Sequence, residues 1–416
     1  MNLSKKILRR NILCIYGITI FHNLIFAYVI ERLFSLSRGM SVEMVAYTEV
    51  IYALVIITLE IPSGYLADIW SRKKLMVIAS LLTCLEFLIL IFAHNFFMFA
   101  LAAIATGIGK AFNSGAENAI FYDTLKELGD EDSFHKHMSK LRFVDYSTCI
   151  VAALLGAYIA YNTSYTFNYF LSLFSCVLAF VCSLFLYDVS VPEKSNENGG
   201  NNNESYGIRK NIDDMKEVFN FFIKNSYILL IALAGVIAAG ITTQIDEFYQ
   251  IYIKDIGFPV YLFGVVSLFS LGACSLGSLL SSKAGKFYSK LSGFIITLCG
   301  LVISIVLLIA SNSYLVVIPL FLFYLCYSVM EPVVLTEIHK NIQGGLRATT
   351  ESFYSLMKRG MTMFIALPFG MISNRISMRM GFTFLVIILS IMILVLVVIS
   401  NVRKEKNEYS EFTYNK

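Results

Sequence analysis

The stretch Gly64-Tyr65-Leu66-Ala67-Asp68-Ile69-Trp70-Ser71-Arg72-Lys73-Lys74 is a short charged turn between two long apolar runs. Each flanking run is about 20 residues long, the length that a helix needs to cross a hydrocarbon core of about 30 Å. Basic residues at the end of a span mark the cytoplasmic face of a membrane. The turn therefore predicts two membrane-spanning helices joined by a cytoplasmic loop.

Apolar runs of the same length recur along nearly the whole chain. Of its 416 residues, 57% are hydrophobic and only 15% are charged, which excludes an ordinary soluble domain. Spanning segments must satisfy their backbone hydrogen bonds internally, and the sequence lacks the alternation of a membrane barrel. We therefore expect an all-α integral membrane protein with twelve transmembrane helices. Their approximate bounds are 12–30, 44–66, 75–93, 96–118, 143–162, 165–187, 226–252, 260–281, 291–310, 313–336, 347–373 and 380–400.

The lysines and arginines gather on one side of this topology. If the N-terminus is cytoplasmic, the same side receives the 72–74 turn, the loop with Arg142 and the tail after 402, while the opposite loops carry few basic residues, among them Arg32 and Arg38. We expect a multi-pass protein of the plasma (inner) membrane with both termini cytoplasmic and an uncleaved first helix. The net charge of +4 then reflects topology and gives no reason to expect a nucleic-acid partner.

The chain divides into two halves of six spans. Residues 188–225 are rich in Asn, Gly and Glu and predict a cytoplasmic linker, because such a segment cannot bury a core. The end of the linker, 212–224, alternates charged and apolar residues and predicts an amphipathic helix at the membrane surface. The predicted domains are an N-terminal bundle 1–187, the linker 188–225, a C-terminal bundle 226–402 and a cytoplasmic tail 403–416.

The twelve spans, the linker and the Gly64–Lys74 loop together resemble the major facilitator superfamily of transporters, and the segments 60–64 and 114–123 are similar to bacterial efflux or multidrug permeases. The resemblance implies two pseudo-symmetric six-helix bundles that alternate access to a central cavity. It also implies a cytoplasmic conformational latch formed by Gly64, Asp68, Arg72 and Asp123. In that latch Asp68 lies against the helix start near Gly345, and Arg72 reaches Asp123.

Two observations stand against parts of this resemblance. The basic residues 72–74 are also explained as topology determinants alone. The fourth span has Ala102–Ala105 where many proton-coupled drug exporters carry an arginine, and the fifth lacks a Gly-Pro-x-x-Gly-Gly run. These departures leave the fold expectation intact and weaken the case for proton-driven drug antiport.

Polar residues inside the spans are the candidate site. An ionisable side chain at bilayer depth costs about 2.5–3.5 kcal/mol on insertion scales, so it should face a cavity or a partner. Lys110, Asn113 and Glu117 follow at i, i+3 and i+7 and form one polar stripe on the fourth span. The alternative is that Lys110 and Glu117 simply pair within the helix. Asn23 adds a polar group on the first span.

The second half offers Asp246 on the seventh span and Glu331 before a proline on the tenth. Proton coupling requires a carboxylate that can take up and release a proton in the working pH range. Glu117, Asp246 and Glu331 are the candidate carriers, although Asp246 is also explained as a solvated residue at the headgroup level. We expect the charges of the eleventh span to form an ion-pair network between the bundles. Those charges are Glu351, Lys358 and Arg359.

The sequence contains no phosphate-binding loop and no catalytic cluster, so no enzyme is expected. All eight cysteines fall inside predicted spans without Cys-x-x-Cys spacing, and we expect no disulfide, metal or cofactor. The chain is read as a monomeric secondary active transporter for proton-coupled export of a small amphipathic compound, such as an antibiotic or toxic metabolite.

The first alternative is proton-coupled uptake of a small nutrient, which would need more fixed polar ligands than this sparse set. The second is a membrane receptor or enzyme that transports nothing.

Overall fold

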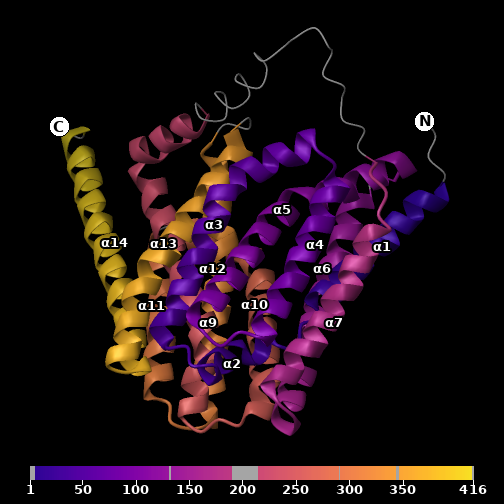
Figure 1. The fold of residues 1–416 in the computed structure, drawn as a ribbon. Coiled ribbons are helices and arrows are strands. Elements are labelled where there is room, and N and C mark those ends of the chain that lie inside the picture. The colour runs from indigo at the N-terminus through magenta and orange to yellow at the C-terminus, as the bar shows by residue number, and fades with distance from the viewer. Residues whose placement is uncertain (1–4, 131–132, 190–213, 290, 343–345, 415–416) are drawn as a thin grey trace. The chain divides into compact units, whose positions relative to one another are not determined.

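The computed structural model describes residues 5–130, 133–189, 214–289, 291–342 and 346–414, in which helices joined by short loops are present and no strand occurs (Figure 1). Contacts between helices divide the chain into two compact units. The first unit comprises Met1–Asn201 with Phe258–Leu268, and the second comprises Asn202–Gly257 with Phe269–Lys416. The predicted all-α membrane architecture is confirmed.

The helices have the following bounds. Those before the linker are α1 (Lys5–Asn23), the 3-10 helix η1 (Tyr28–Ile30), α2 (Glu31–Ser37), α3 (Val42–Ile69), α4 (Arg72–Ile91), α5 (Phe96–Leu128), α6 (Phe134–Asn162) and α7 (Tyr165–Leu184). Those after the linker are α9 (Ser226–Asp255), η3 (Val260–Leu262), α10 (Phe263–Ser281), η4 (Ala284–Ser289), α11 (Leu291–Ala310), η5 (Tyr314–Val316), α12 (Val317–Lys340), α13 (Arg347–Arg375) and α14 (Met378–Tyr414).

Eleven segments of the described chain are long and apolar enough to cross a membrane. Helix α13 occupies the place of the expected eleventh span and is 29 residues long. It carries Lys358 and Arg359 in its middle, and these charges keep it outside the set of eleven. Of the twelve expected transmembrane helices, eleven are therefore supported by their length and apolar composition. The remaining one, α13, is supported by its length and its position in the chain.

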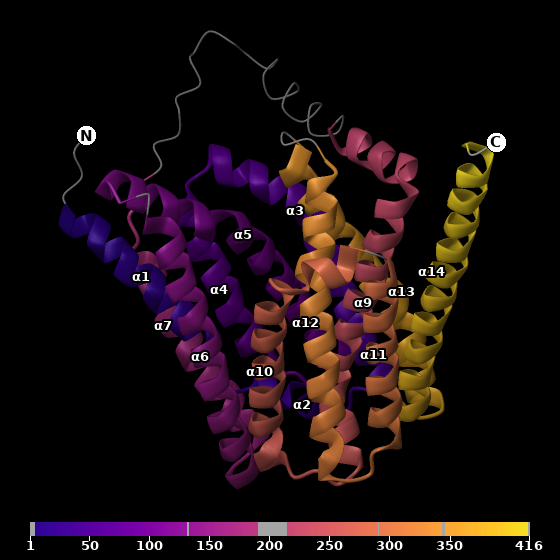
Figure 2. The same ribbon diagram turned by 180° about the vertical axis from the view of Figure 1, so that it is seen from behind.

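In the first unit, α4 packs against α5 and α7, and α1 packs against α6 and α7 (Figure 2). The starts of four helices are capped by a side-chain oxygen that accepts a backbone N–H of the first turn. The capping residues are Ser41, Ser71, Asn95 and Ser164. Each cap is worth about 1 kcal/mol, and together they fix where the spans begin.

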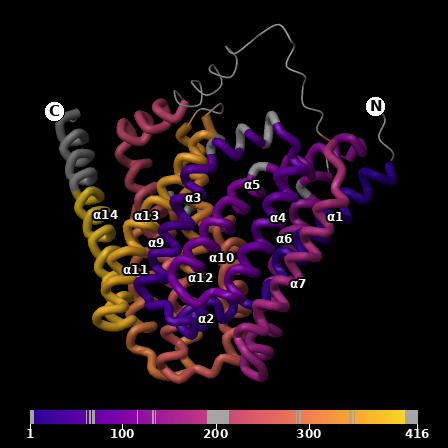
Figure 3. Tube along the Cα trace, in the orientation of Figure 1, coloured from indigo at the N-terminus to yellow at the C-terminus, as the bar shows by residue number. Residues whose placement is uncertain are grey.

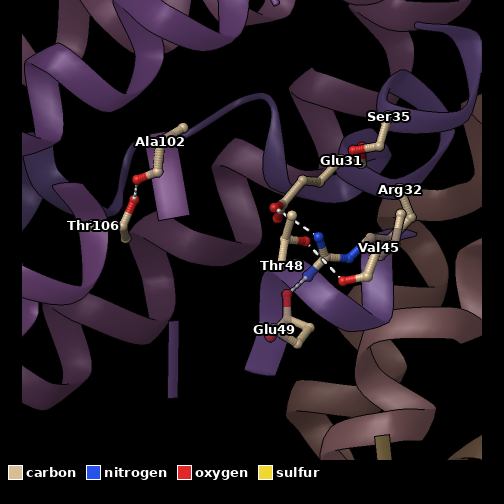
Figure 4. Close-up of polar contacts among 8 residues, drawn as sticks. All are labelled: Glu31, Arg32, Ser35, Val45, Thr48, Glu49, Ala102 and Thr106. Carbon is tan, nitrogen blue, oxygen red and sulfur yellow. Dashed lines mark hydrogen bonds and ion pairs between the residues drawn. The ribbon is translucent and has the colours of Figure 1, made fainter. Parts of the chain in front are cut away.

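The first span is not the single helix over 12–30 that the sequence predicts. Helix α1 ends at Asn23, the chain is irregular for four residues, and η1 and α2 follow at the end of the unit opposite the N-terminus (Figure 3). Arg32, expected in an exposed loop, lies on α2 beside Glu31 and Glu49 and is only 6% exposed (Figure 4). The cause of the interruption lies on α7, which offers buried polar side chains to the freed backbone.

Three α7 side chains bond to the interrupted segment. Asn168 Nδ2 donates to Phe26 O at 2.8 Å, and Ser175 Oγ donates to Phe21 O at 2.7 Å. Ser172 Oγ accepts the backbone N–H of Ala27 at 3.1 Å. An irregular backbone is tolerated at membrane depth only where such partners satisfy it. The α7 polar face thus makes the break in the first span possible.

In the second unit, α9 packs against α12, α13 and α14, while α11 packs against α12 and α14. The approach of α13 to α9 is close at Gly240, where an added Cβ would lie 3.0 Å from Ile365 Cδ1. Small residues at such crossings let helices in a membrane gain packing contacts without side-chain spacers.

The segment before α9 contains a helix over residues 214–224. Val218 and Phe222 are buried, and the Phe222 ring stacks on that of Phe353 of α13 with centroids 5.6 Å apart. The amphipathic helix predicted here is therefore present in its described part. The Phe219 ring also meets Phe353 edge-on with centroids 6.3 Å apart, although Phe219 and Ile223 remain largely exposed.

Candidate functional site

The first unit contains a cavity of about 280 Å³ between α1, α5 and α6. Part of its lining is apolar and belongs to a hydrophobic cluster that includes Ile15, Ile18 and Phe121. The rest of the lining is polar and charged. The polar lining residues are Thr19, His22, Asn23, Lys110, Asn113, Ser114, Glu117, Asn118, Arg142 and Asp145.

Helix α5 supplies the charged stripe that the sequence predicts. Lys110, Asn113 and Glu117 all line the cavity, because their i, i+3 and i+7 spacing places them on one helix face. Asn113 Nδ2 donates to Glu117 Oε2 at 2.8 Å. The bonded partner of the Glu117 carboxylate is therefore the neutral Asn113 amide, and Lys110 and Arg142 are cationic neighbours in the same cavity.

Helix α1 contributes its last turn, just before the interruption. Asn23, also predicted, donates its Nδ2 to Thr19 O at 2.9 Å. His22 was not predicted, and its Nε2 lies 3.1 Å from Thr83 Oγ1 of α4. The helix end and these polar side chains together form the α1 wall of the cavity.

Helix α6 contributes two charges that sequence reasoning missed as site residues. Arg142 Nη1 lies 3.6 Å from Asp145 Oδ2, and both residues line the cavity. The apolar pattern places Arg142 in a loop, because the apolar run begins only at 143. The available signal was the i, i+3 spacing, since α6 in fact begins at Phe134, two turns earlier.

The 64–74 segment contains the end of α3 and the start of α4. Arg72 of α4 forms an ion pair with Asp123 of α5, so the predicted contact is present in the structure. The neighbouring Ser71 Oγ donates to Asp188 Oδ2 after α7. The side-chain surroundings of Gly64 and Asp68 lie outside the described part, as does Gly345, and the latch role of these residues stays a prediction.

In the second unit, the two predicted carboxylates have bonding partners of different charge. Asp246 on α9 is exposed and accepts a hydrogen bond of 2.5 Å from the hydroxyl of buried Tyr324 on α12. Glu331 on α12 binds the Lys358 ammonium of α13 at 2.6 Å, and that ammonium lies 5.2 Å from the centroid of the Tyr354 ring. Asp246 has a neutral partner, whereas Glu331 has a cationic one.

The charges of α13 were expected to pair between the bundles. Lys358 instead pairs with Glu331, and Glu351 lies 2.8 Å from Nε2 of His339 on α12. Both contacts are inside the second unit. The expectation is corrected for these residues, and the physical reason is that α12 presents its own titratable side chains toward α13.

Spanning helices around a cavity of solute size, with charges of both signs on its wall, define a membrane protein that handles small molecules. The Major Facilitator Superfamily model matches residues 12–366. The chain belongs to the major facilitator superfamily, and it is a secondary transporter of that type.

The chain is 26% identical over 214 residues to an uncharacterized MFS-type transporter, YxaM, of Bacillus subtilis (strain 168). That match covers 51% of this chain and spans about half of the relative, 50% of its length.

Solved structures of similar fold cover nearly the whole chain. The nucleoside transporter NupG has a TM-score of 0.72 at 12% identity, covering 95% of this chain and 99% of its own. A bacterial homologue of the human lysosomal transporter Spinster, solved inward-facing and unoccupied, has a TM-score of 0.73 at 14% identity, covering 96% and 98%. The peptide transporter POT in complex with sulfate has a TM-score of 0.69 at 14% identity, also covering 96% and 98%. At these identities the likeness establishes the fold alone.

Proposed function

We propose that the chain is a proton-coupled secondary transporter that exports a small amphipathic compound by alternating access, with both termini cytoplasmic in the plasma (inner) membrane. The observation that carries the proposal is the mixed lining of the first-unit cavity. Its apolar lining residues, with Ile15 and Phe121, suit a hydrocarbon or aromatic part of a cargo. Its charged lining residues, with Lys110 and Glu117, suit an ionic or hydrogen-bonding group.

The charged lining residues restrict the kinds of compound that the cavity would accommodate as cargo. A carboxylate whose partner is an amide, as Glu117 is bonded to Asn113, retains its capacity to attract a cation. Lys110 and Arg142 offer the opposite sign on the same wall. The proposed cargo therefore carries at least one charged or strongly polar group beside its apolar part, since a purely apolar compound would leave these groups desolvated without compensation.

A second candidate is uptake of a small polar nutrient by proton symport. The specific observation in its favour is that α6 adds Arg142 and Asp145 to the cavity, so the fixed ligands are more numerous than the sequence indicates. Importers of polar solutes need such ligands because they must replace the hydration of the solute. Under this candidate the same cavity serves a solute moved inward.

One experiment separates the two directions. The chain is expressed in a host without its major efflux pumps, and susceptibility to a panel of cationic, zwitterionic and neutral amphipathic compounds is measured with and without a protonophore. Export predicts resistance to charged members of the panel that disappears with the protonophore and with Glu117→Gln. The matched control is Glu127→Gln, an exposed glutamate near the end of the same helix.

Increased sensitivity, with accumulation of a labelled polar compound, would favour uptake. A protonophore-insensitive phenotype would contradict proton coupling. Identical phenotypes for Glu117→Gln and the wild type would contradict the assignment of the cavity.

A further inference from the structure

A second cavity of the first unit is an open groove between α1 and α6, with a volume of about 740 Å³. Helix α6 lines it with Lys136, Lys140, Phe143 and Val144, and α1 adds Tyr16. The four α6 residues follow at i, i+4, i+7 and i+8, so they share one face of that helix. None of these five residues lines the cavity described above, so the groove is a separate feature of the same unit.

The groove changes from charged to apolar along the axis of α6. The helix begins at Phe134, whereas its apolar run begins only at 143, so both lysines precede the membrane-spanning part. Phe143, the first residue of the apolar run, is 73% exposed. In a bilayer this order places the lysines at the depth of the headgroups, and Phe143 and Val144 at the beginning of the acyl chains. The groove therefore offers an amphiphile a cationic end and an apolar end.

The ammonium groups of both lysines are available to a ligand. Within the described ranges, neither ammonium forms an ion pair or a hydrogen bond. Two acids near them in the sequence are already in contact with other bases. Asp130 lies 3.8 Å from His137, and Asp145 lies 3.6 Å from Arg142. Each lysine thus keeps its charge and its three N–H donors for a partner outside the protein.

We infer that the groove is a binding site for one anionic phospholipid of the surrounding bilayer. The phosphate lies between the Lys136 and Lys140 ammonium groups, where charge-assisted hydrogen bonds to its oxygens are strong. The acyl chains follow Phe143 and Val144, and Tyr16 forms the α1 side of the site. A lipid with net negative charge complements two unpaired cations, whereas the choline of a zwitterionic lipid adds a cation beside them. A free phosphate would leave the apolar part of the groove unfilled.

The test places a fluorescent reporter in the groove. In the full chain carrying Trp70→Phe and Phe143→Trp, the native tryptophan is removed and the new one lies where an acyl chain is expected. Phe143 is exposed, so its replacement leaves the packing of the helices unchanged. The protein is reconstituted into phosphatidylcholine vesicles that contain a small, equal fraction of either brominated phosphatidylglycerol or brominated phosphatidylcholine. Bromine on the acyl chains quenches tryptophan fluorescence on contact.

Brominated phosphatidylglycerol should quench more strongly than brominated phosphatidylcholine. Each lysine near the membrane surface favours an anionic lipid by about fivefold, so the two together predict an enrichment of about tenfold or more. Adding Lys136→Gln and Lys140→Gln should make the two lipids quench equally. The matched control adds Lys126→Gln and Lys224→Gln, which remove the same charge at exposed positions outside the groove and should leave the enrichment intact.

Three results would overturn the inference. The first is equal quenching by the two brominated lipids when all four lysines are present. The second is the same loss of enrichment in the groove variant and the control, which would assign the effect to surface charge in general. The third is relief of quenching by inorganic phosphate but not by sodium chloride of equal ionic strength, which would assign the lysines to a free anion.

The lipid site depends on the membrane fold alone and goes beyond the proposed function. Brominated lipid is present in both leaflets, so the quenching is independent of the orientation of the chain and of solute movement. Failure of the transport assays above would therefore remove the proposed function while leaving the lipid site intact.

Discussion

Replacing Asn168 should destabilise the first unit, because this side chain holds the interruption in the first span. Asn168 is fully buried on α7, and its Nδ2 donates to Phe26 O and to Gly156 O, both at 2.8 Å. In Asn168→Ala both acceptors lose that donor. Phe26 lies in the irregular segment, so its carbonyl loses a bond that costs about 1–3 kcal/mol when it is left unmade.

The loss of the hydrogen bond to the second acceptor, Gly156 O, costs less free energy. Gly156 is inside α6, where the helix backbone also supplies a donor, so the lost bond is worth about 0.6 kcal/mol, the average for side-chain bonds between membrane helices. Together these losses predict that the free energy of unfolding falls by about 2–4 kcal/mol. Equilibrium unfolding of the purified protein in mixed detergent micelles, followed by circular dichroism, measures this change.

The matched control is Asn162→Ala. Asn162 is exposed, and its Nδ2 donates to Tyr158 O of its own helix. Its removal should change the unfolding free energy by less than about 0.5 kcal/mol. If Asn168→Ala unfolds at the same detergent fraction as the control, the α7 side chain does not stabilise the break, and the account of the first span is wrong.

Three further predictions concern charged residues. Asp68→Asn should abolish transport at normal membrane abundance, measured by transport assay and immunoblot; unimpaired transport would remove the latch. Glu331→Gln should lower stability by about 1–3 kcal/mol, because Lys358 loses its carboxylate, and Glu331→Gln/Lys358→Met should recover most of that loss in thermal unfolding. Equal losses in the single and double variants would show that the pair is not the source. Glu117→Gln keeps an acceptor for its amide neighbour and removes the charge, so the apparent affinity for a cationic cargo should fall about tenfold or more, a loss of about 1.4 kcal/mol. An unchanged dose response would contradict contact between that carboxylate and the cargo.

The fold was predictable because its signals are local. The length of an apolar run, a cap such as Ser41 or Asn95, and a basic turn at 72–74 each lie within a few residues of the helix end that they define. The break after Asn23 was not predictable in this way. It contains neither glycine nor proline, and its partner Asn168 is 142 residues from Phe26 in the sequence.

The candidate site likewise has one part that was predictable from the sequence and another that was not. The stripe of Lys110, Asn113 and Glu117 was predictable because helical spacing alone places the three residues on one face. The lining contributed by α6, with Arg142, required knowing that α6 extends beyond its apolar run.

The bonding partner of each carboxylate also indicates whether that carboxylate suits a role as proton carrier or a role in a structural ion pair. Protonation of a carboxylate costs less where it does not break a strong ion pair. Glu331 is bound to Lys358 at 2.6 Å, so protonating it in this conformation leaves a partly buried ammonium without compensation. Asp246 accepts its bond from the neutral hydroxyl of Tyr324, which can remain a partner in either protonation state. The geometry therefore favours Asp246 over Glu331 as the carrier in the second unit, and neutralising Asp246 should uncouple transport from the proton gradient while stability stays near that of the wild type.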